Sequence, residues 1–238
     1  MTARHLQLYV TTESPCGYYD DRVSRNLVPD PQVQMTMPIY NSLIQHGFRR
    51  SGSHCYRPYC NDCNDCIACR IRAVDFKPDR SQRRCLKANA DLKMIEVPAG
   101  IEDEYFDLYR RYVNSRHGDG SMANPDPDAF SDFLYSNWSD TRFLCFYLED
   151  RLVAVAVTDM VADGASAVYS FFDPALEKRS LGTYCILKQL ELVKSLGLDY
   201  VYLGYWIRQH PKMHYKTRYS ALEIYRDERW WNYDPTHS

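Results

Sequence analysis

Hydrophobic periodicity in the second half of the chain predicts two helices. Residues 102–116 place apolar side chains at helical spacing, with acidic residues at the start and basic residues at the end, as the helix dipole favours. Residues 128–138 predict a second, shorter helix. The apolar run at residues 152–157 is far too short to span a bilayer, so it predicts a buried strand.

Strands follow these helices along the chain. Residues 143–148 and 152–159 predict a hairpin that turns at residues 149–151, and residues 167–172 predict a third strand. Ser180 is the expected N-cap of a helix that ends before Gly197. A final apolar strand is predicted at residues 200–207. This order predicts a mixed α/β fold.

The N-terminal part of the chain is different, because it is rich in Cys, Pro and Arg. One helix is predicted there, at residues 38–46, with Pro in its first turn and Gly47 just past its end. We therefore expect two domains, an N-terminal Cys/Arg-rich domain over residues 1–95 and a second domain over residues 96–238.

The order and lengths of the predicted elements in the second domain resemble the acyl-CoA N-acetyltransferase fold. In that family a loop and helix N-terminus after the fourth strand hold the donor, and the splayed fourth and fifth strands form the cleft. Arg179 and Gly182 lie in a segment similar to the phosphate-binding loop of that family. Such a loop directs helix N–H groups at an anion or a donor carbonyl.

Charge is distributed unevenly along the 238 residues, although the formal net charge is only −2. Residues 70–87 contain seven Lys or Arg against two Asp, and residues 208–218 contain four Lys or Arg and no acid. Two basic segments in an otherwise acidic chain suit a polyanionic ligand held at one place, or else are solvated surface.

Nine cysteines occur in the chain, and five of them fall within residues 55–69. The N-terminus has no basic and apolar export signal, so we expect a cytoplasmic protein with reduced thiols or metal ligands. The three-residue spacing from Cys60 to Cys69 resembles a ferredoxin cluster run, but Arg70 stands where that pattern requires its fourth Cys. An iron–sulfur cluster, a zinc site and free thiols remain open from this spacing.

Longer motifs carry a closer resemblance, which spans nearly the whole chain in order. They are Ser14-Pro15-Cys16-Gly17-Tyr18, Tyr56-Arg57-Pro58, Pro78-x-Arg80-Ser81-Gln82-Arg83-Arg84, Arg116-His117-x-Asp119-Gly120-x-Met122, Ala167-Val168-Tyr169-x-Phe171-Phe172-Asp173-Pro174, Arg179-Ser180-Leu181-Gly182-Thr183-Tyr184, Tyr202-Leu203-Gly204-Tyr205-Trp206-Ile207 and Lys212-Met213-x-Tyr215-Lys216. With them the sequence resembles the bacterial aspartate/glutamate leucyltransferases, short relatives of the eukaryotic arginyl-tRNA–protein transferases.

The resemblance implies transfer of leucine from leucyl-tRNA to proteins that begin with Asp or Glu, which marks them for degradation. The eukaryotic relatives carry further cysteines linked with an iron–sulfur cluster, but Tyr19 takes one of those places here and no Cys-Cys pair exists. We therefore expect that no cofactor is required. Any metal would be held by Cys16, Cys60, Cys63 and Cys66.

The implied reaction assigns roles to particular residues. An acceptor carboxylate requires a cation, and Arg70 and Arg72 are our candidates. His117 and Asp119 are the candidates for a general base, although their Gly-rich segment also suits a turn. Residues for tRNA or donor binding are Arg80, Arg83, Arg84, Lys87, Arg179, Gly182, Trp206, Lys212, Tyr215 and Lys216.

Three other functions remain open from the sequence. The same motifs would serve an enzyme that uses arginyl-tRNA, since they do not report the donor pocket. The fold alone also allows an acyl-CoA-dependent N-acetyltransferase. The third alternative is a regulator without enzymatic activity, built around a metal or cluster at residues 55–69.

Overall fold

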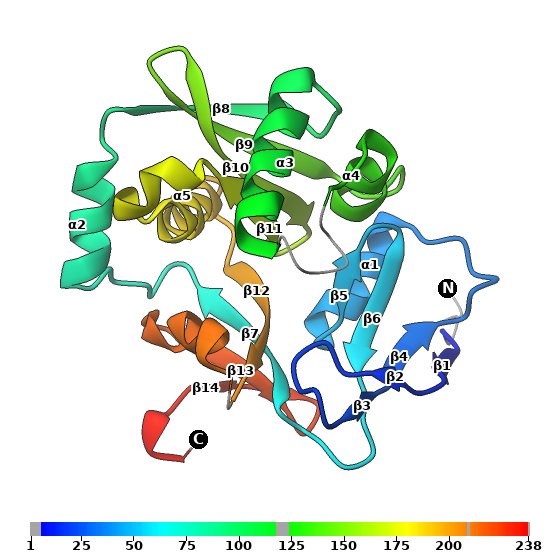
Figure 1. The fold of residues 1–238 in the computed structure, drawn as a ribbon. Helices are drawn as coiled ribbons and strands as arrows, with labels where there is room; N and C mark the ends of the chain where they lie inside the picture. The colour runs from blue at the N-terminus through cyan, green and yellow to red at the C-terminus, as the bar shows by residue number, and fades with distance from the viewer. Residues whose placement is uncertain (1–5, 118–123, 209, 238) are drawn as a thin grey trace.

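A computed structural model describes residues 6–117, 124–208 and 210–237. Its centre is an eight-stranded sheet in the order β14-β13-β7-β12-β11-β10-β9-β8 (Figure 1). The strands of this sheet are β7 (Cys66–Arg72), β8 (Leu92–Pro98), β9 (Thr141–Leu148), β10 (Arg151–Val161), β11 (Gly164–Phe172), β12 (Tyr200–Ile207), β13 (Leu222–Arg226) and β14 (Arg229–Asn232).

Helices cover both faces of the sheet. Helices α3 (Asp103–His117) and α4 (Pro127–Leu134) lie on one face, and α5 (Leu181–Ser195) lies on the other, with α2 (Arg80–Ala88) beside it. Strand β9 shows this division, because Phe143 packs with α3 and Leu144 packs with α5. The predicted mixed α/β fold is therefore confirmed. None of the described helices is long and apolar enough to cross a membrane.

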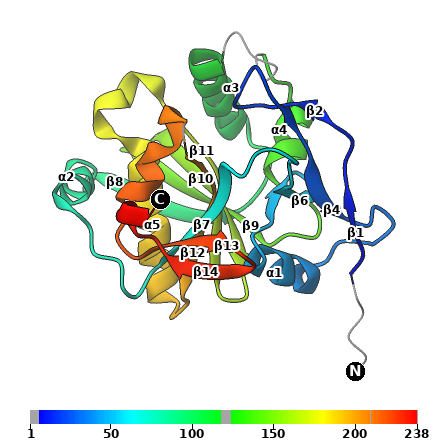
Figure 2. The same ribbon diagram turned by 90° about the horizontal axis from the view of Figure 1, so that it is seen from below.

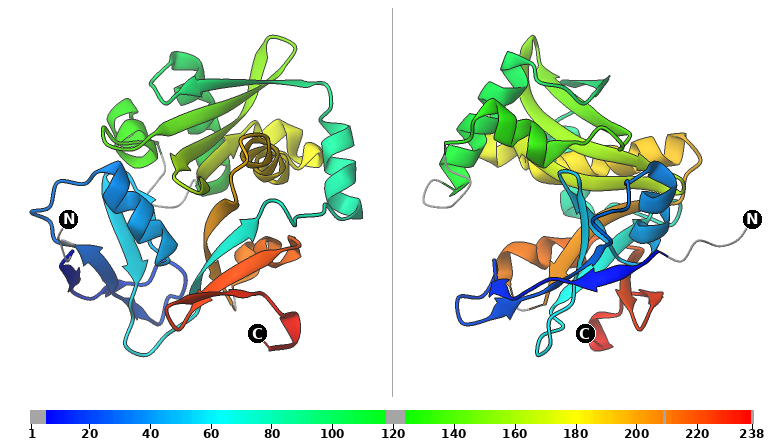
Figure 3. Two further views of the ribbon diagram at one scale, coloured as in Figure 1. Left: turned by 180° about the vertical axis from the view of Figure 1, so that it is seen from behind. Right: turned by 90° about the vertical axis from the view of Figure 1, so that its right-hand side faces the viewer.

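A smaller lobe is formed by the N-terminal residues. It contains α1 (Met37–Gln45) and a sheet in the order β1-β4-β6-β5, made of β1 (Leu8–Val10), β4 (Asn26–Pro29), β6 (His54–Pro58) and β5 (Arg49–Ser51). The two-stranded ribbon of β2 (Ser14–Pro15) and β3 (Val23–Ser24) completes this N-terminal lobe. Figure 3 shows the lobe, in blue, beside the large sheet.

The boundary expected after residue 95 does not separate these two parts. Strand β7 lies before this boundary and strand β8 crosses it, yet both strands belong to the large sheet. Strand β7 pairs with β12 and with β13, which come from the other end of the chain. The division between lobe and sheet therefore falls at the cysteine-rich loop that precedes Cys66.

Most predicted elements of the second half are present, with two corrections. Helix α4 ends at Leu134 and not at residue 138, because Tyr135 has extended backbone angles. Ser180 precedes α5 as expected, but it lies in the left-handed region with φ 54° and its side chain caps no helix N–H. The backbone carbonyl of Ser180 accepts the N–H of Tyr184 instead.

Strands β11 and β12 pair only briefly. They are parallel over Gly164–Ser166 and Tyr200–Tyr202, and then they separate. Gly164 permits their close approach, because a Cβ at that position would lie 1.9 Å from the Tyr200 carbonyl oxygen. Gly204, with φ 74°, follows the break in register between β12 and β7. The splayed fourth and fifth strands expected for this fold are thus present.

A buried ion pair joins the N-terminal lobe to the large sheet. Arg50 on β5 and Asp159 on β10 have fully buried side chains, and two guanidinium nitrogens donate to the carboxylate at 2.7 Å. The hydroxyl groups of Tyr40 and Thr141 also donate to Asp159, at 3.0 Å and 2.6 Å. The guanidinium of Arg50 and the carboxylate of Asp159 are therefore both hydrogen-bonded inside the protein.

Replacement of Asp159 by Asn tests the contribution of this pair. The substitution leaves the Arg50 cation buried without its counter-charge, so we expect the free energy of unfolding to fall by about 3–5 kcal/mol. Denaturant unfolding followed by circular dichroism measures the change. The control is Glu96→Gln, which disrupts a half-exposed ion pair with Arg142 and should cost about 1 kcal/mol or less. Equal losses in the two variants would contradict the special role of the buried pair.

Candidate active site

Two cavities lie side by side where the N-terminal lobe meets the large sheet. One, of 680 Å³, opens between β11 and β12 and is called the cleft here. The other, of 770 Å³, is lined by Cys16, Cys60, Cys63 and Cys66 and is called the cysteine cavity. Both cavities are lined by Tyr18, Tyr56 and Tyr205, so these three rings form the wall between them.

Arg49 bridges the two strands that enclose the cleft. Its guanidinium donates to the backbone carbonyls of Ala167 and Val168 on β11, and to that of Leu203 on β12. The last of these distances is 3.5 Å. A side chain at position 204 would collide with this group, since a Cβ there would lie 1.7 Å from Arg49 Nη1. The glycine therefore allows an arginine from the N-terminal lobe to enter the gap.

Lys216 is the second cation at this gap. It lies in the 3-10 segment η2 (Pro211–Arg218) and is only 2% exposed. Its ammonium donates to the backbone carbonyls of Leu203 at 2.8 Å and Tyr205 at 2.5 Å. Burial lowers the pKa of Lys216 from its usual value to about 8. This lysine therefore loses its proton more readily than an exposed lysine does.

The charge of the cleft is positive. Besides Arg49 and Lys216, its lining includes Arg116 on α3, whose nearest acid, Glu177, is 3.9 Å away. Arg50 also reaches the lining, but Asp159 neutralises it. No Asp or Glu is among the described residues that line the cleft. Apolar and aromatic groups complete its wall, namely Tyr112, Phe133, Val168, Tyr169, Cys185, Ile186, Leu203 and Met213.

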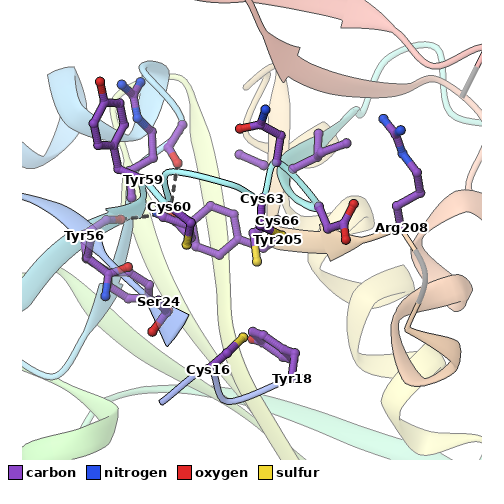
Figure 4. A pocket seen from close by; sticks show the side chains of 18 of the residues that line it. Cys16, Tyr18, Ser24, Tyr56, Tyr59, Cys60, Cys63, Cys66, Tyr205 and Arg208 are labelled. Atoms are coloured by element: carbon purple, nitrogen blue, oxygen red, sulfur yellow. Dashed lines mark hydrogen bonds between the residues drawn. The ribbon is translucent and has the colours of Figure 1, made fainter. Parts of the chain in front are cut away.

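The cysteine cavity brings together thiols from two segments of the chain. Cys16 comes from the β2–β3 ribbon, whereas Cys60, Cys63 and Cys66 come from the loop before β7 (Figure 4). Arg22 reaches into this loop, where it donates to the Cys63 thiol at 3.3 Å and to the Asp65 carboxylate at 3.0 Å. The spacing of these cysteines therefore indicated a real spatial group.

The thiols do not form a metal site as they are arranged. Within the described ranges no three His, Cys, Asp or Glu side chains converge with metal-ligand geometry. Burial, together with the neighbouring thiols of Cys63, Cys16 and Cys60, raises the pKa of Cys66 to about 12. Metal ligands are thiolates, so binding of a metal here would require a change in the arrangement of these thiols and the loss of their protons.

Cys55 and Cys69 are separate from this group. Cys55 is 3% exposed within the N-terminal lobe, and burial raises its pKa to about 12. Cys69 is buried on β7 and donates its S–H to the carbonyl of Gly204 at 3.4 Å. These two of the five crowded cysteines are therefore core residues.

The basic segment at residues 70–87 contains helix α2 and its exposed cations. A capping box of Asp79 and Gln82 begins the helix, and only Gln82 and Cys85 of the helix are buried. The exposed cations are Arg80, Arg83, Arg84 and Lys87. In the described part of the chain none of the four forms an ion pair. Figure 2 shows that α2 lies on the side of the molecule opposite the N-terminal lobe.

The segment that resembles a phosphate loop lies beside the end of α2. Arg179 donates through both terminal nitrogens to Asp91 at 2.8 Å, so its guanidinium is already paired with a carboxylate. Gly182 packs against the ring of Phe172, where a Cβ would lie at 3.2 Å. These contacts connect α5 to α2 and β11 within the fold.

The two candidates for acceptor recognition lie outside both cavities. Arg70 is 8% exposed, donates to Glu223 at 2.7 Å and stacks on the ring of Tyr200, whose centroid is 3.5 Å away. Its charge is therefore neutralised within the sheet. Arg72 is exposed and forms a surface pair with Asp75 at 3.3 Å. The structure brings Arg49 and Arg116 to the cleft instead.

The remaining candidates have different surroundings. Trp206 is 3% exposed and packs edge-on against Tyr233, so it is a core residue and offers no surface for stacking. Tyr215 is 41% exposed and lines the cleft beside Lys216. Lys212 belongs to η2, and His117 is the last residue of α3. The side chains of both, and the whole of Asp119, lie outside the described residues.

Sequence reasoning missed Arg49, which has the most contacts with the splayed strands. No motif marked it, because its partners are backbone carbonyls more than one hundred residues away. An available signal was the pair of adjacent arginines, Arg49 and Arg50, directly after Phe48. Strand residues alternate between faces, so adjacent arginines in a buried strand require two separate sets of partners.

Comparison with solved structures gives distant similarity. L-PGS from Bacillus licheniformis is 11% identical and has a TM-score of 0.44, and the match covers 71% of this chain and 51% of that chain.

Comparison with curated proteins gives much closer relatives. The aspartate/glutamate leucyltransferase of Teredinibacter turnerae is 49% identical over 230 residues, which cover 96% of this chain and 95% of that protein. The protein of the same name from Pseudomonas aeruginosa is 48% identical over 228 residues, with 94% and 96% covered.

Family models match both parts of the chain. The model described as "Arginine-tRNA-protein transferase, N terminus" matches residues 14–84, which include most of the N-terminal lobe and the four cysteines of the cysteine cavity. The model described as "Arginine-tRNA-protein transferase, C terminus" matches residues 104–226, which include the splayed strands and Lys216. The chain therefore belongs to the arginine-tRNA-protein transferase family.

Proposed function

We propose that this protein transfers leucine from leucyl-tRNA to the N-terminal amine of proteins that begin with Asp or Glu. The names and high coverage of the relatives support this activity. The observation that carries the proposal is the charge of the cleft, where Arg49, Arg116 and Lys216 face apolar side chains and no lining carboxylate is described.

This charge favours leucine over arginine as the donated residue. An arginyl group would bring a further cation next to Arg49, Arg116 and the protonated form of Lys216, and like charges at close range repel strongly where water is excluded. A leucyl group is neutral and apolar, so it can pack against side chains such as Val168, Ile186 and Met213. The proposed cleft therefore disfavours an arginyl group as the donated residue.

The same cations suit the acceptor. An N-terminal Asp or Glu carries a side-chain carboxylate, and arginine binds carboxylates with two parallel hydrogen bonds. Arg116 is held less tightly than Arg49, because its ion pair with the exposed Glu177 is 3.9 Å long, so it takes the place that the sequence suggested for Arg70. Arg49, held by three backbone carbonyls, adds a fixed positive charge.

The chemistry requires no external energy source. The aminoacyl group is already activated as an ester, so amide formation needs the acceptor amine and the ester carbonyl to be held in contact. An α-amine has a pKa of about 8, which leaves a useful neutral fraction near pH 7. Binding of both reactants in one cleft therefore supplies much of the rate. Attachment of leucine would then mark the acceptor protein for degradation.

A direct transfer assay tests the donor. An Asp-starting peptide is mixed with leucyl-tRNA or with arginyl-tRNA, each charged with labelled amino acid, and label on the peptide is measured. We expect labelling from leucyl-tRNA only, because arginine would be repelled by the cleft. The control peptide begins with Ala and should stay unlabelled. Transfer from arginyl-tRNA alone would overturn the donor assignment, and no transfer from either would reject the enzyme.

The exposed cations of α2 are the tRNA contacts in this proposal. Arg80, Arg83, Arg84 and Lys87 share one solvent-facing helix, and Asp79 at its N-cap is the nearest acid in the sequence. Tyr215, at the cleft, is the aromatic ring exposed for stacking on an unpaired base of the tRNA end. Lys212, which belongs to η2, is proposed as a further contact with the tRNA.

Salt dependence measures these phosphate contacts. Arg84→Ala should weaken tRNA binding and reduce the slope of log affinity against log salt by about one unit, because one released counterion is lost. Arg110→Ala is the matched control, since Arg110 is also an exposed helical arginine, on α3, but pairs with Asp107 at 2.8 Å. An unchanged slope in Arg84→Ala, or the same change in both variants, would remove α2 from the tRNA interface.

The cysteine cavity is proposed to act without a metal. We expect the purified protein to be colourless and to transfer leucine without added iron, because its thiols are not arranged as ligands. Absorption spectra, iron and zinc analysis, and activity after chelation test this. Cys16→Ser should keep activity, as should the control Cys145→Ser in the core. Stoichiometric iron or zinc, with activity lost on its removal, would refute the proposal.

A further inference from the structure

Lys216 has an unusual environment for a lysine. It is 2% exposed, yet the described part of the chain places no carboxylate within ion-pair distance of it. Its two hydrogen-bond acceptors, the carbonyls of Leu203 and Tyr205, are uncharged. Buried ammonium groups are normally paired with an acid, so this arrangement indicates a function beyond stability.

The two carbonyls leave one position on the nitrogen free. A protonated lysine has three N–H groups, and a neutral one has two N–H groups and a lone pair. Leu203 and Tyr205 accept two N–H groups in either state. The third position holds a proton or the lone pair, and the side chain lines the cleft in which the reactants would meet. Lys216 can therefore gain or lose a proton without breaking its contacts with β12.

The groups that face Lys216 determine how readily it loses its proton. Arg49 from β5 disfavours the ammonium of Lys216. The nearby thiols of Cys69 and Cys66 on β7 have raised pKa values, so they stay neutral and do not offset this effect. The ring of Tyr215 lies 5.8 Å from the nitrogen, and Arg116 from α3 lines the same cleft. Burial is the largest influence, and it brings the pKa of Lys216 to about 8.

We propose that Lys216 is the proton carrier of the transfer reaction, a catalytic residue that takes a proton from the attacking amine and returns it to the leaving ribose oxygen. This inference rests on the proposed leucyl transfer. It assigns to Lys216 the general-base role expected at His117 and Asp119. It also explains why a titratable lysine stands here where an arginine would bind the same carbonyls more rigidly.

The proton balance closes within one turnover. The acceptor nitrogen forms a bond to the leucyl carbonyl carbon and becomes an ammonium. The neutral amine of Lys216 takes one proton from it. When the bond between that carbon and the ribose oxygen breaks, the Lys216 ammonium gives its proton to the oxygen. The products are the amide and the free hydroxyl of the tRNA, and Lys216 is neutral again.

A weakly basic acceptor separates titration of Lys216 from titration of the substrate. An ordinary α-amine has a pKa of about 8, so its own titration would hide that of the lysine. In the test, the acceptor is an Asp-like peptide with an aminooxy group in place of the amine, which stays neutral throughout. Single-turnover leucyl transfer is then measured from about pH 6 to about pH 10. We expect the rate to rise with an inflection near pH 8.

Lys216→Arg is the decisive variant. Arginine keeps N–H donors for the two carbonyls but is always protonated, so it cannot accept the proton. We expect the transfer rate to fall by about 100- to 10,000-fold, with no inflection near pH 8. The matched control is Lys194→Arg. Lys194 also donates to a backbone carbonyl, that of Phe76 at 3.2 Å, but from an exposed position on α5, and its variant should behave as the wild type.

The outcomes separate this inference from the proposed function. Thermal unfolding shows whether the Lys216→Arg variant is folded. If the variant does not fold, the pH profile of the wild type still tests the proposal. Leucyl transfer by the wild type with a flat profile, or a Lys216→Arg rate within about threefold of wild type, would overturn the role of Lys216 and leave the function intact. Absence of leucyl transfer by the wild type with any acceptor would overturn the function itself.

Discussion

The separation of β11 from β12 is the constraint on which the site depends. After three paired residues on each strand, the backbone carbonyls of Ala167, Val168, Leu203 and Tyr205 have no partner across the gap. A buried carbonyl left unsatisfied costs about 1–3 kcal/mol. Arg49 and Lys216 provide the missing donors from two other parts of the chain. Arg49 and Lys216 therefore hold the cleft open. The cleft is positively charged because the carbonyls of its walls are hydrogen-bonded by basic side chains.

This constraint also explains why the N-terminal lobe is part of the site. Arg49 and Arg50 are consecutive residues of β5, so their side chains leave the strand on opposite faces. Arg49 enters the gap between the splayed strands, and Arg50 pairs with Asp159 in the core. The buried pair fixes the position of β5, and a fixed β5 sets the position of Arg49. Tyr18 and Tyr56, which the lobe contributes to the wall of the cleft, are positioned by the same attachment.

The sequence predicted elements whose signals are local. Periodicity located α3, the β9–β10 hairpin and β12 because each buries a continuous apolar face. It missed β7, because this strand mixes Cys, Ile and Arg next to a cysteine run. Nothing in that segment shows that its partners are β12 and β13, more than one hundred residues later. The site shows the same limit. Lys216 was named through a motif, but Arg70 was assigned to a ligand because its internal partners, Glu223 and Tyr200, were not visible along the chain.

The different chemistry of the two cations matches their places at the gap. Arg49 contacts carbonyls on both strands, which suits a planar group that is charged at every physiological pH. Lys216 contacts carbonyls of β12 alone, and its point-like nitrogen keeps one position directed away from the strand. Exchange of the two residues would keep both side chains cationic but would place the permanent cation at the position proposed for proton transfer. For the proposed reaction, which must both attract a carboxylate and transfer a proton, the cleft therefore needs one cation of each kind.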